Sequence, residues 1–253
     1  ELLHIIDRHP EIATSDDHSG AIGFDAQENL LNRLTEEEGQ RSREIRERGR
    51  VFLNGLKQRC ERAGTGDVDI RQRYGQLLDT LDEQQREVAL YVLGRRGRSA
   101  AHTQRDLGRH VESISRKIQR PILTVASEFS EPKSLLVAYD GKRMTRGCIT
   151  LIAGNAALAD LPVHVVMSGK QTNESEKQLH WATETLELGG FSVETAYLPG
   201  DPEQQIMRVL NDREIDLLVM GAYSQSPLRS LFLGSRTNDL LRASRVPTVT
   251  VHL

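Results

Sequence analysis

Short apolar runs alternate along this chain with longer stretches in which apolar and charged residues recur every three or four positions. The short runs have the length and the Val, Ile and Leu content of buried parallel strands, and the longer stretches have the period of amphipathic helices. The alternation predicts βαβ units and parallel sheets. The expected strands are Leu2–Ile6, Val68–Gln72, Ala89–Leu93, Ile122–Val125, Leu135–Tyr139, Val163–Met167, Ser192–Tyr197, Leu217–Met220 and Thr248–Val251. The expected helices are Ala26–Ala63, Leu77–Gln84, His110–Ile118, Arg143–Ala157, Ser175–Leu188, Pro202–Asn211 and Thr237–Ala243.

The loop from Gly221 to Ser235, GAYSQSPLRSLFLGS, follows the apolar run DLLVM and precedes the amphipathic segment RTNDLLRAS. A strand, a glycine-bearing loop and a helix start in this order can build an anion cradle, because the first amides of a helix have no intrahelical partner. The loop therefore predicts a phosphate ligand. Ser235 also fits a plain N-cap, the commonest use of a serine at a helix start, and both interpretations stay open.

The spacing of this loop resembles the G-x2-G-x9-G-[S/T] signature of the nucleotide-binding universal stress proteins, with Ser224 in place of the second glycine. A side chain at that point restricts the backbone more than glycine does. Three further segments are similar to strands of the same family. They are SLLVAYDG (134–141) for the first strand, LPVHVVMSG (161–169) for the second and VPTVTV (246–251) for the last.

This resemblance covers residues 132–253 and implies an α/β domain that binds ATP or a related adenine nucleotide, with or without Mg²⁺. On the family pattern, Asp140 lies near the adenosine and Thr237 near the phosphates. Asp140 followed by Gly141 is also a turn signal, so a purely structural role stays open. Lys142 departs from the small residue that many members carry there. The implied binding residues are Asp140, the backbone around Val165 and Met220, Gly221, Ser224, Gly234, Ser235, Arg236 and Thr237.

An internal repeat points to two related domains in tandem. Residues 94–125 align with the loop and last strand of 221–251, with Gly94 on Gly221, and LLHII lies over PVHVV, with His4 on His164. We expect domains at 1–127 and 133–253, each a parallel sheet flanked by helices, paired within the chain through their last strands, PILTV and PTVTV. The first copy has no counterpart of residues 134–160, which we interpret as one missing β-α unit of about 30 residues.

The first copy is expected to be free of nucleotide, because Arg109 stands where the second copy has Ser235. A guanidinium there would fill the cradle itself or hold a free anion. The surrounding segment is rich in base but has no aromatic residue for base stacking, so a solvated face is favoured over a nucleic-acid surface. The basic residues are Arg95, Arg96, Arg98, Arg105, Arg109, Arg116, Lys117 and Arg120.

Length and composition agree with two small soluble domains, and the two cysteines are interpreted as ordinary reduced residues of a cytoplasmic protein. The 253 residues are 38% hydrophobic and 27% charged, the net charge is -3, and no apolar run approaches the ~20 residues of a membrane span. Cys60 and Cys148 lie in helical segments without zinc spacing. No phosphate-binding P-loop, nucleophile elbow or metal motif is present in the sequence.

We therefore expect a non-enzymatic stress-response regulator that binds an adenine nucleotide in its second domain. A ligand-free tandem scaffold acting through protein partners, and a slow ATPase, are the alternatives. Homodimerisation stays open, and membrane or nucleic-acid partners are not expected.

Overall fold

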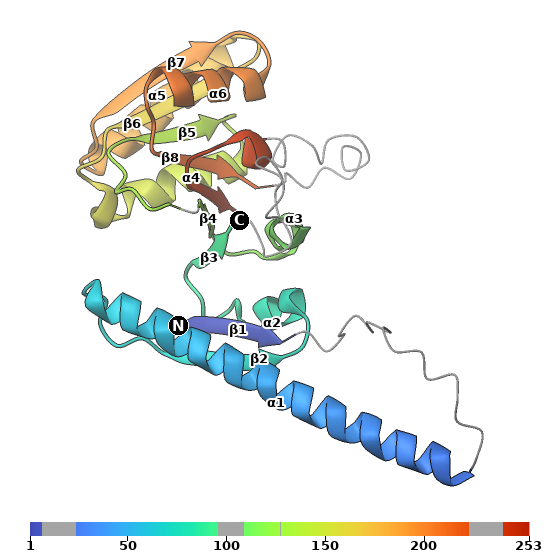
Figure 1. The fold of residues 1–253 in the computed structure, drawn as a ribbon. Helices are drawn as coiled ribbons and strands as arrows, with labels where there is room; N and C mark the ends of the chain where they lie inside the picture. The colour runs from blue at the N-terminus through green and yellow to red at the C-terminus, as the bar shows by residue number, and fades with distance from the viewer. Residues whose placement is uncertain (7–23, 96–108, 127, 223–239, 253) are drawn as a thin grey trace. The chain divides into compact units, whose positions relative to one another are not determined.

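The computed structural model describes residues 1–6, 24–95, 109–126, 128–222 and 240–252 (Figure 1). The chain divides into two compact units, Glu1–Thr80 and Leu81–Leu253. The second unit takes in residues on both sides of the expected domain boundary at 127–133, since strands from both copies share its sheet. The expected boundaries themselves stay predictions.

The first unit contains a small parallel sheet of β1 (Leu2–Ile6) and β2 (Ile70–Tyr74), joined by the long helix α1 (Phe24–Arg62). The charged segment 35–50 lies in α1 and is mostly exposed, as a solvated helix face should be. Ion pairs one turn apart, such as Arg48 with Glu44 at 3.0 Å, support this face.

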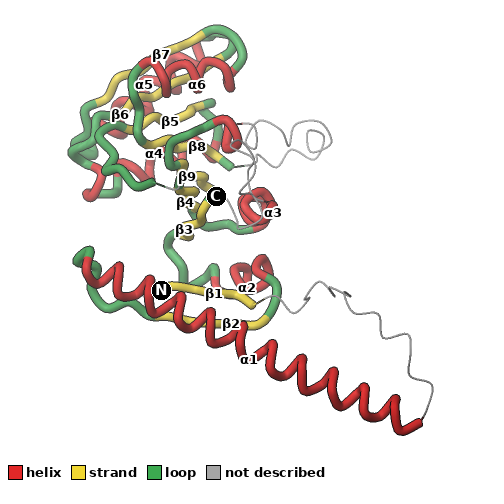
Figure 2. Tube along the Cα trace, viewed as in Figure 1, coloured by secondary structure: helices red, strands yellow, loops and turns green. Residues whose placement is uncertain are grey.

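The second unit contains a seven-stranded sheet in the order β3-β4-β9-β8-β5-β6-β7 (Figures 1 and 2). All neighbouring strands are parallel except β4 and β9, which are antiparallel. The expected pairing through the last strands of the two copies is therefore confirmed. The strands are β3 (Tyr91–Gly94), β4 (Ile122–Val125), β5 (Leu135–Tyr139), β6 (Val163–Ser168), β7 (Val193–Leu198), β8 (Leu217–Gly221) and β9 (Thr248–Val251).

Helices cover both faces of this sheet, which explains why its central strands are apolar on both sides. On one face Val137 and Val165 pack with Ile149 and Ile152, and on the other Leu136 packs in the cluster that contains the α6 side chains. Local signals fix the helix starts: Thr172 and Ser175 form a capping box for α5, and Asp201 caps α6 ahead of a proline. The helices are α2 (Leu77–Gln84), α3 (Arg109–Lys117), α4 (Arg143–Ala153), α5 (Asn173–Leu188), α6 (Pro202–Asp212), a 3-10 turn at Ala156–Leu158 and a short helix over 240–243.

Matched backbone hydrogen bonds in β3–β4 and β8–β9 agree with the expected repeat. The N–H of Tyr91 donates to the carbonyl of Pro121 at 3.0 Å, and the N–H of Leu218 donates to that of Pro247 at 3.0 Å. Four residues later, Arg95 bonds to Val125 at 2.9 Å and Ala222 bonds to Val251 at 2.8 Å. The pair β3–β4 thus reproduces β8–β9 in the register that places Gly94 on Gly221.

The alignment of His4 with His164 was wrong. His4 pairs with Gln72 across the ladder and lies against α1, with its ring centroid 6.2 Å from that of Phe52. His164 lies instead beside Arg213, at the end of α6, whereas the helix that follows its strand is α5. His4 therefore faces the helix that follows its strand, whereas His164 faces the opposite side of the sheet. Because successive residues of a strand point to opposite faces, a correct alignment of the two strands must be shifted by an odd number of residues.

Two predicted strands begin two residues later than expected. β2 begins at Ile70 rather than Val68, and β3 begins at Tyr91 rather than Ala89. Val68 is buried although it precedes the strand, so its apolar character did not mark the ladder. The pairing of Leu2 with Ile70 sets the observed register.

None of the described helices is long and apolar enough to cross a lipid bilayer.

Candidate nucleotide site at the sheet's switch point

The carboxyl ends of β5 and β8 meet where the chain changes direction in the sheet. From β5 the chain proceeds outward through β6 and β7, whereas β8 and β9 lie on the other side of β5. In open α/β sheets such a reversal leaves a crevice in which ligands bind. Asp140 directly follows β5 and Gly221 ends β8, so the structure places two of the predicted site residues at this point.

The Asp140 carboxylate is held by its own turn. Its Oδ1 accepts a hydrogen bond from the Thr145 hydroxyl at 2.7 Å and another from the Lys142 N–H at 3.0 Å. Gly141 between them has φ +73°, a conformation that favours glycine. The structural role of Asp140 as a turn residue is therefore confirmed. Its Oδ2 lies 3.6 Å from Nζ of Lys142, and both side chains are at least half-exposed.

Gly221 brings the start of the glycine loop against the first turn of α4. A Cβ at this position would lie 3.0 Å from Cβ of Met144 and 3.3 Å from Cγ2 of Thr145. Close packing on α4 thus favours a glycine here, independently of any ligand. The α4 N-cap is Lys142, which makes no capping hydrogen bond with its side chain. The positive end of the helix dipole at this point favours an anion.

The other predicted residues are distributed unequally. Met220 lies in β8 just before Gly221, and its side chain is buried on the α6 face. Val165 lies deeper in the sheet, since it pairs with Val137 and Thr195 and three further residues of β6 follow it. Ser224, Gly234, Ser235, Arg236 and Thr237 lie outside the described residues.

Sequence reasoning missed two contributors to this corner. Thr145 joins both halves of the site, through its hydroxyl to Asp140 and through its methyl group to the surroundings of Gly221. The carboxamide of Gln178, from α5, fills the space that a Cβ on Gly141 would occupy. A hydroxyl residue in the first turn after a strand-ending aspartate is a usable signal for Thr145. The Gln178 contact joins α5 to the turn at Gly141, far away in the sequence, and has no such signal.

The potential nucleophiles near this corner, Tyr139 and Cys148, are in their unreactive protonated forms. Burial raises the pKa of the Tyr139 phenol to about 12 and that of the Cys148 thiol to about 12. Both groups therefore stay protonated near neutral pH, and the thiolate is the reactive form of cysteine. The described residues include no cluster of three or more metal-binding side chains.

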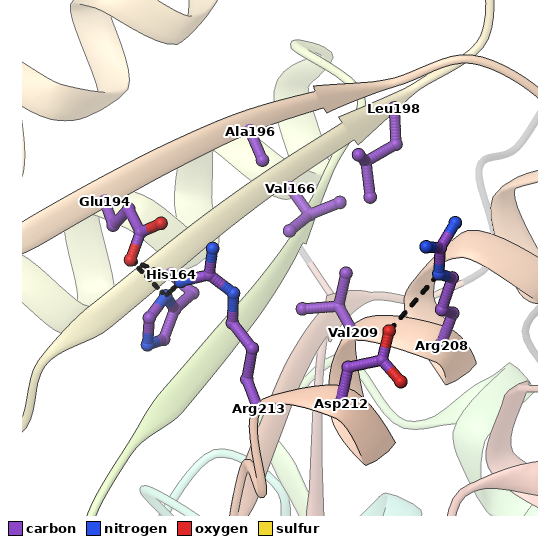
Figure 3. A pocket seen from close by; sticks show the side chains of 9 residues that line it. All are labelled: His164, Val166, Glu194, Ala196, Leu198, Arg208, Val209, Asp212 and Arg213. Carbon is purple, nitrogen blue, oxygen red and sulfur yellow. Dashed lines mark hydrogen bonds and ion pairs between the residues drawn. The ribbon is translucent and has the colours of Figure 1, made fainter.

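A separate hollow of about 180 Å³ lies on the α6 face of β6 and β7 (Figure 3). Its floor is apolar, and its charged residues pair with one another: Arg213 with Glu194, and Arg208 with Asp212 at 3.2 Å. His164 Nδ1 lies 3.3 Å from Glu194, which agrees with the structural role expected for this histidine. The lining residues are His164, Val166, Glu194, Ala196, Leu198, Arg208, Val209, Asp212 and Arg213.

Electrostatics at this hollow follow from the same contacts. Burial lowers the pKa of His164, an effect that the Glu194 carboxylate opposes and Arg213 reinforces. The hydrogen bond from Arg213 lowers the pKa of Glu194. The group is thus an ion-pair network in which the neutral form of His164 is favoured.

Comparison with known proteins places the chain among relatives of one kind. Residues 149–252 match the model of the universal stress protein family. The universal stress protein Slr1230 of Synechocystis sp. is 33% identical over 99% of this chain and 88% of its own length.

Solved structures share the fold. A universal stress protein from Archaeoglobus fulgidus has a TM-score of 0.66 at 15% identity, over 83% of this chain and 77% of its own. A putative universal stress protein from Pseudomonas aeruginosa has a TM-score of 0.57 at 19% identity, over 80% and 77% of the two chains. Near-complete coverage by a relative with one third of its residues identical is decisive: this chain belongs to the universal stress protein family.

Proposed function

We propose that this protein is a cytoplasmic stress-response regulator that binds ATP or a related adenine nucleotide in its second copy. The observation that carries the proposal is the meeting of Asp140 and Gly221 at the switch point, where Thr145 contacts both. Membership of the family agrees with this assignment. The first copy, in which α3 begins at Arg109, is proposed to be free of nucleotide.

The described residues suit one end of such a ligand. Asp140 Oδ2 is free of turn hydrogen bonds and could accept from a hydroxyl or amino group of an adenosine. The N-terminus of α4 presents amide donors at the same corner. The segment from Ser224 to Thr237, with Gly234 and Ser235, would hold the phosphates, with or without Mg²⁺.

Binding without turnover is the expected chemistry. Phosphoryl transfer requires a positioned metal and a group that orients the nucleophile. At this corner the described candidates are the Asp140 carboxylate, whose Oδ1 is engaged in its turn, and the protonated Tyr139 and Cys148. We expect single-turnover release of phosphate from ATP to be far slower than the ~1–100 per second of kinases.

One observation supports a second candidate, a ligand-free scaffold that acts through protein partners. The Lys142 ammonium lies 3.6 Å from Asp140, so the site supplies its own counter-ion in place of the small residue common in the family. Mass spectrometry of nucleotide released from the purified protein separates the two: bound ATP or AMP supports the nucleotide site, and its absence together with no binding on titration supports the scaffold.

Calorimetric titration with ATP and AMP tests the site itself. Ser235→Arg introduces the residue of the first copy and should abolish binding, because the guanidinium would occupy the phosphate position. Ser230→Arg adds the same charge to the same loop at a spacer position, where the motif specifies no residue, and serves as the control. Equal affinities for the two variants would show that the phosphate site is elsewhere.

A further inference from the structure

The two carboxylate oxygens of Asp140 have different partners. Oδ1 accepts both hydrogen bonds of the turn, from the Thr145 hydroxyl and from the Lys142 N–H. Oδ2 accepts no hydrogen bond from the described residues, and its neighbour is Nζ of Lys142 at 3.6 Å. That distance is an ion-pair contact and is too long for a hydrogen bond. Because the turn holds Oδ1, Oδ2 keeps a fixed position with its lone pairs available to a donor from a ligand.

The Lys142 ammonium is held only loosely by this contact. The Lys142 side chain is 60% exposed and the Asp140 side chain 50%, and an ion pair between groups so exposed contributes little to stability. An ammonium carries three N–H donors, and Lys142 uses none of them in a hydrogen bond to a described residue. Lys142 can therefore bind an anionic group of a ligand without breaking a hydrogen bond of the fold.

The first turn of α4 adds further positive charge at the same end. Arg143 is exposed, and Arg146 lies over the Trp181 ring with its guanidinium carbon 4.0 Å from the ring centroid. Neither arginine has an ion-pair partner among the described residues, and the turn contains no acidic residue. Cations at a helix N-terminus are opposed by the helix dipole. The local structure therefore leaves an excess of positive charge that an anionic ligand at Lys142 would offset.

Oδ2 and Nζ together suit a ligand that carries a donor and an anion on neighbouring atoms. The proposed adenosine has two adjacent ribose hydroxyls, on its 2′ and 3′ carbons. If one of them is phosphorylated, the free hydroxyl donates to Oδ2 and the phosphate accepts from Nζ, a common role of lysine. With an unmodified ribose, the ammonium has no anion to bind. Dinucleotide-binding folds divide these tasks between an acidic side chain for free ribose hydroxyls and a basic one for a ribose phosphate.

We propose that Lys142 is a specificity-determining residue, which selects an adenine nucleotide phosphorylated on its 2′ or 3′ ribose oxygen. The inference rests on the adenine-nucleotide site of the proposed function and adds the position of a further phosphate. Asp140 binds the remaining ribose hydroxyl and Lys142 binds the ribose phosphate. Arg143 contributes only a charge that salt screens.

Calorimetric titration of the full chain with four nucleotides tests this selection. Adenosine 3′,5′-bisphosphate and adenosine 2′,5′-bisphosphate carry the ribose phosphate, and 5′-AMP lacks it. ADP has as many phosphates as the bisphosphates, but both are at the 5′ end. Because a hydrogen bond to a charged group is stronger than one between neutral groups, one of the two bisphosphates should bind roughly tenfold more tightly than 5′-AMP. The tighter of the two identifies which ribose oxygen carries the phosphate.

Two exposed positions, one residue apart, provide matched variants. Lys142→Ser should weaken binding of the preferred bisphosphate roughly tenfold, since the phosphate loses its donor. The same variant should change the affinities for 5′-AMP and ADP by less than about threefold, because only a screened charge is removed from their surroundings. Arg143→Ser removes an equal charge from the next residue and should keep the preference for the bisphosphate within about threefold of the parent.

The outcomes separate this inference from the function on which it rests. Equal affinities of the parent protein for the bisphosphates and 5′-AMP would overturn the role of Lys142 and leave the adenine-nucleotide site standing. Equal losses in Lys142→Ser and Arg143→Ser, or a loss of ADP affinity in Lys142→Ser as large as that of the bisphosphate, would also overturn it. If neither ATP, ADP, 5′-AMP nor either bisphosphate bound, the proposed function and this inference would both be wrong.

Discussion

The hydroxyl of Thr145 donates to Oδ1 of Asp140 at 2.7 Å, and its methyl carbon lies where a side chain at Gly221 would collide. One buried residue of α4 therefore sets the position of both strand ends at the switch point. The orientation of Asp140 and the start of the glycine loop are coupled through it.

Thr145→Val keeps the shape of this side chain and removes the hydroxyl. We expect the affinity for ATP to fall roughly fivefold, since a net hydrogen bond contributes about 1 kcal/mol and Asp140 loses a partner that orients it. Isothermal calorimetry measures the change. Thr150→Val, which removes an exposed hydroxyl bonded to the Arg146 carbonyl in the same helix, is the control and should bind as the parent does. Equal affinity of Thr145→Val and the parent would refute the role given to Thr145.

Gly221→Ala should destabilise the second unit by about 1–3 kcal/mol, because the added methyl group enters packed space between β8 and α4. Trp181, the only tryptophan of the chain, lies in α5 and reports on this unit in urea unfolding. Gly154→Ala, where a Cβ would meet the Thr150 carbonyl at 3.4 Å, is the matched change and should shift stability by less than about 0.5 kcal/mol. If the urea midpoint of Gly221→Ala equalled that of Gly154→Ala, α4 would be able to shift away from β8 and accommodate the methyl group, which would contradict the prediction.

Thr124 and Thr248 lie opposite each other across the antiparallel joint of β4 and β9, and both are fully buried. Thr124 Oγ1 has no hydrogen-bond partner among the described residues, whereas Thr248 donates to the Val246 carbonyl at 3.1 Å. Thr124→Val should therefore stabilise the unit by about 1 kcal/mol, and Thr248→Val should destabilise it by a similar amount. Thermal unfolding followed at Trp181 measures both, and the same sign for the two changes would contradict the assignment.

Acidification should weaken the second unit through His164. Its pKa in the folded protein lies below the ordinary value of 6.5, so as pH falls through 6.5 the unfolded chain binds a proton that the native state does not. Stability is then lost until the pH passes below the folded pKa. Glu194, whose pKa is also lowered, adds a further loss as pH falls below 4.5. His164→Gln should reduce the fall in the urea midpoint between pH 7.5 and 5.5. If the midpoint of the variant fell by as much as that of the parent, His164 would be excluded as the source.

Periodicity was sufficient for much of the fold. The strands at Leu2–Ile6, Ile122–Val125, Leu135–Tyr139 and Thr248–Val251 lie where the apolar runs predict them, because each run coincides with a ladder segment. β2 was displaced because the three central residues of IRQRY are polar, so no apolar run marks the strand, and its register depends on distant Leu2. The sequence pattern also could not predict which face of the sheet the His164 side chain occupies, because a shift of one residue along a strand moves a side chain to the opposite face.

The sequence predicted where the candidate site lies in the fold, but not which side chains contact one another there. Asp140 and Gly221 end apolar strands, and parallel strands bring such ends to one edge. Val165 was carried over with the family pattern, and its place three residues before the end of β6 depends on the length of that strand. The role of Thr145 depends on how closely α4 approaches β8, which only packing decides.

The antiparallel joint of β4 and β9 links strands from both copies inside one polypeptide. Two separate chains paired in this way would come apart on dilution, whereas strands joined by a short connection experience an effective concentration in the millimolar range whatever the protein concentration. Nine residues, 126–134, connect β4 to β5 and so join the two copies. The joint should therefore stay closed at the scarcest levels of expression, and mixing with subunits of related proteins should not exchange its strands.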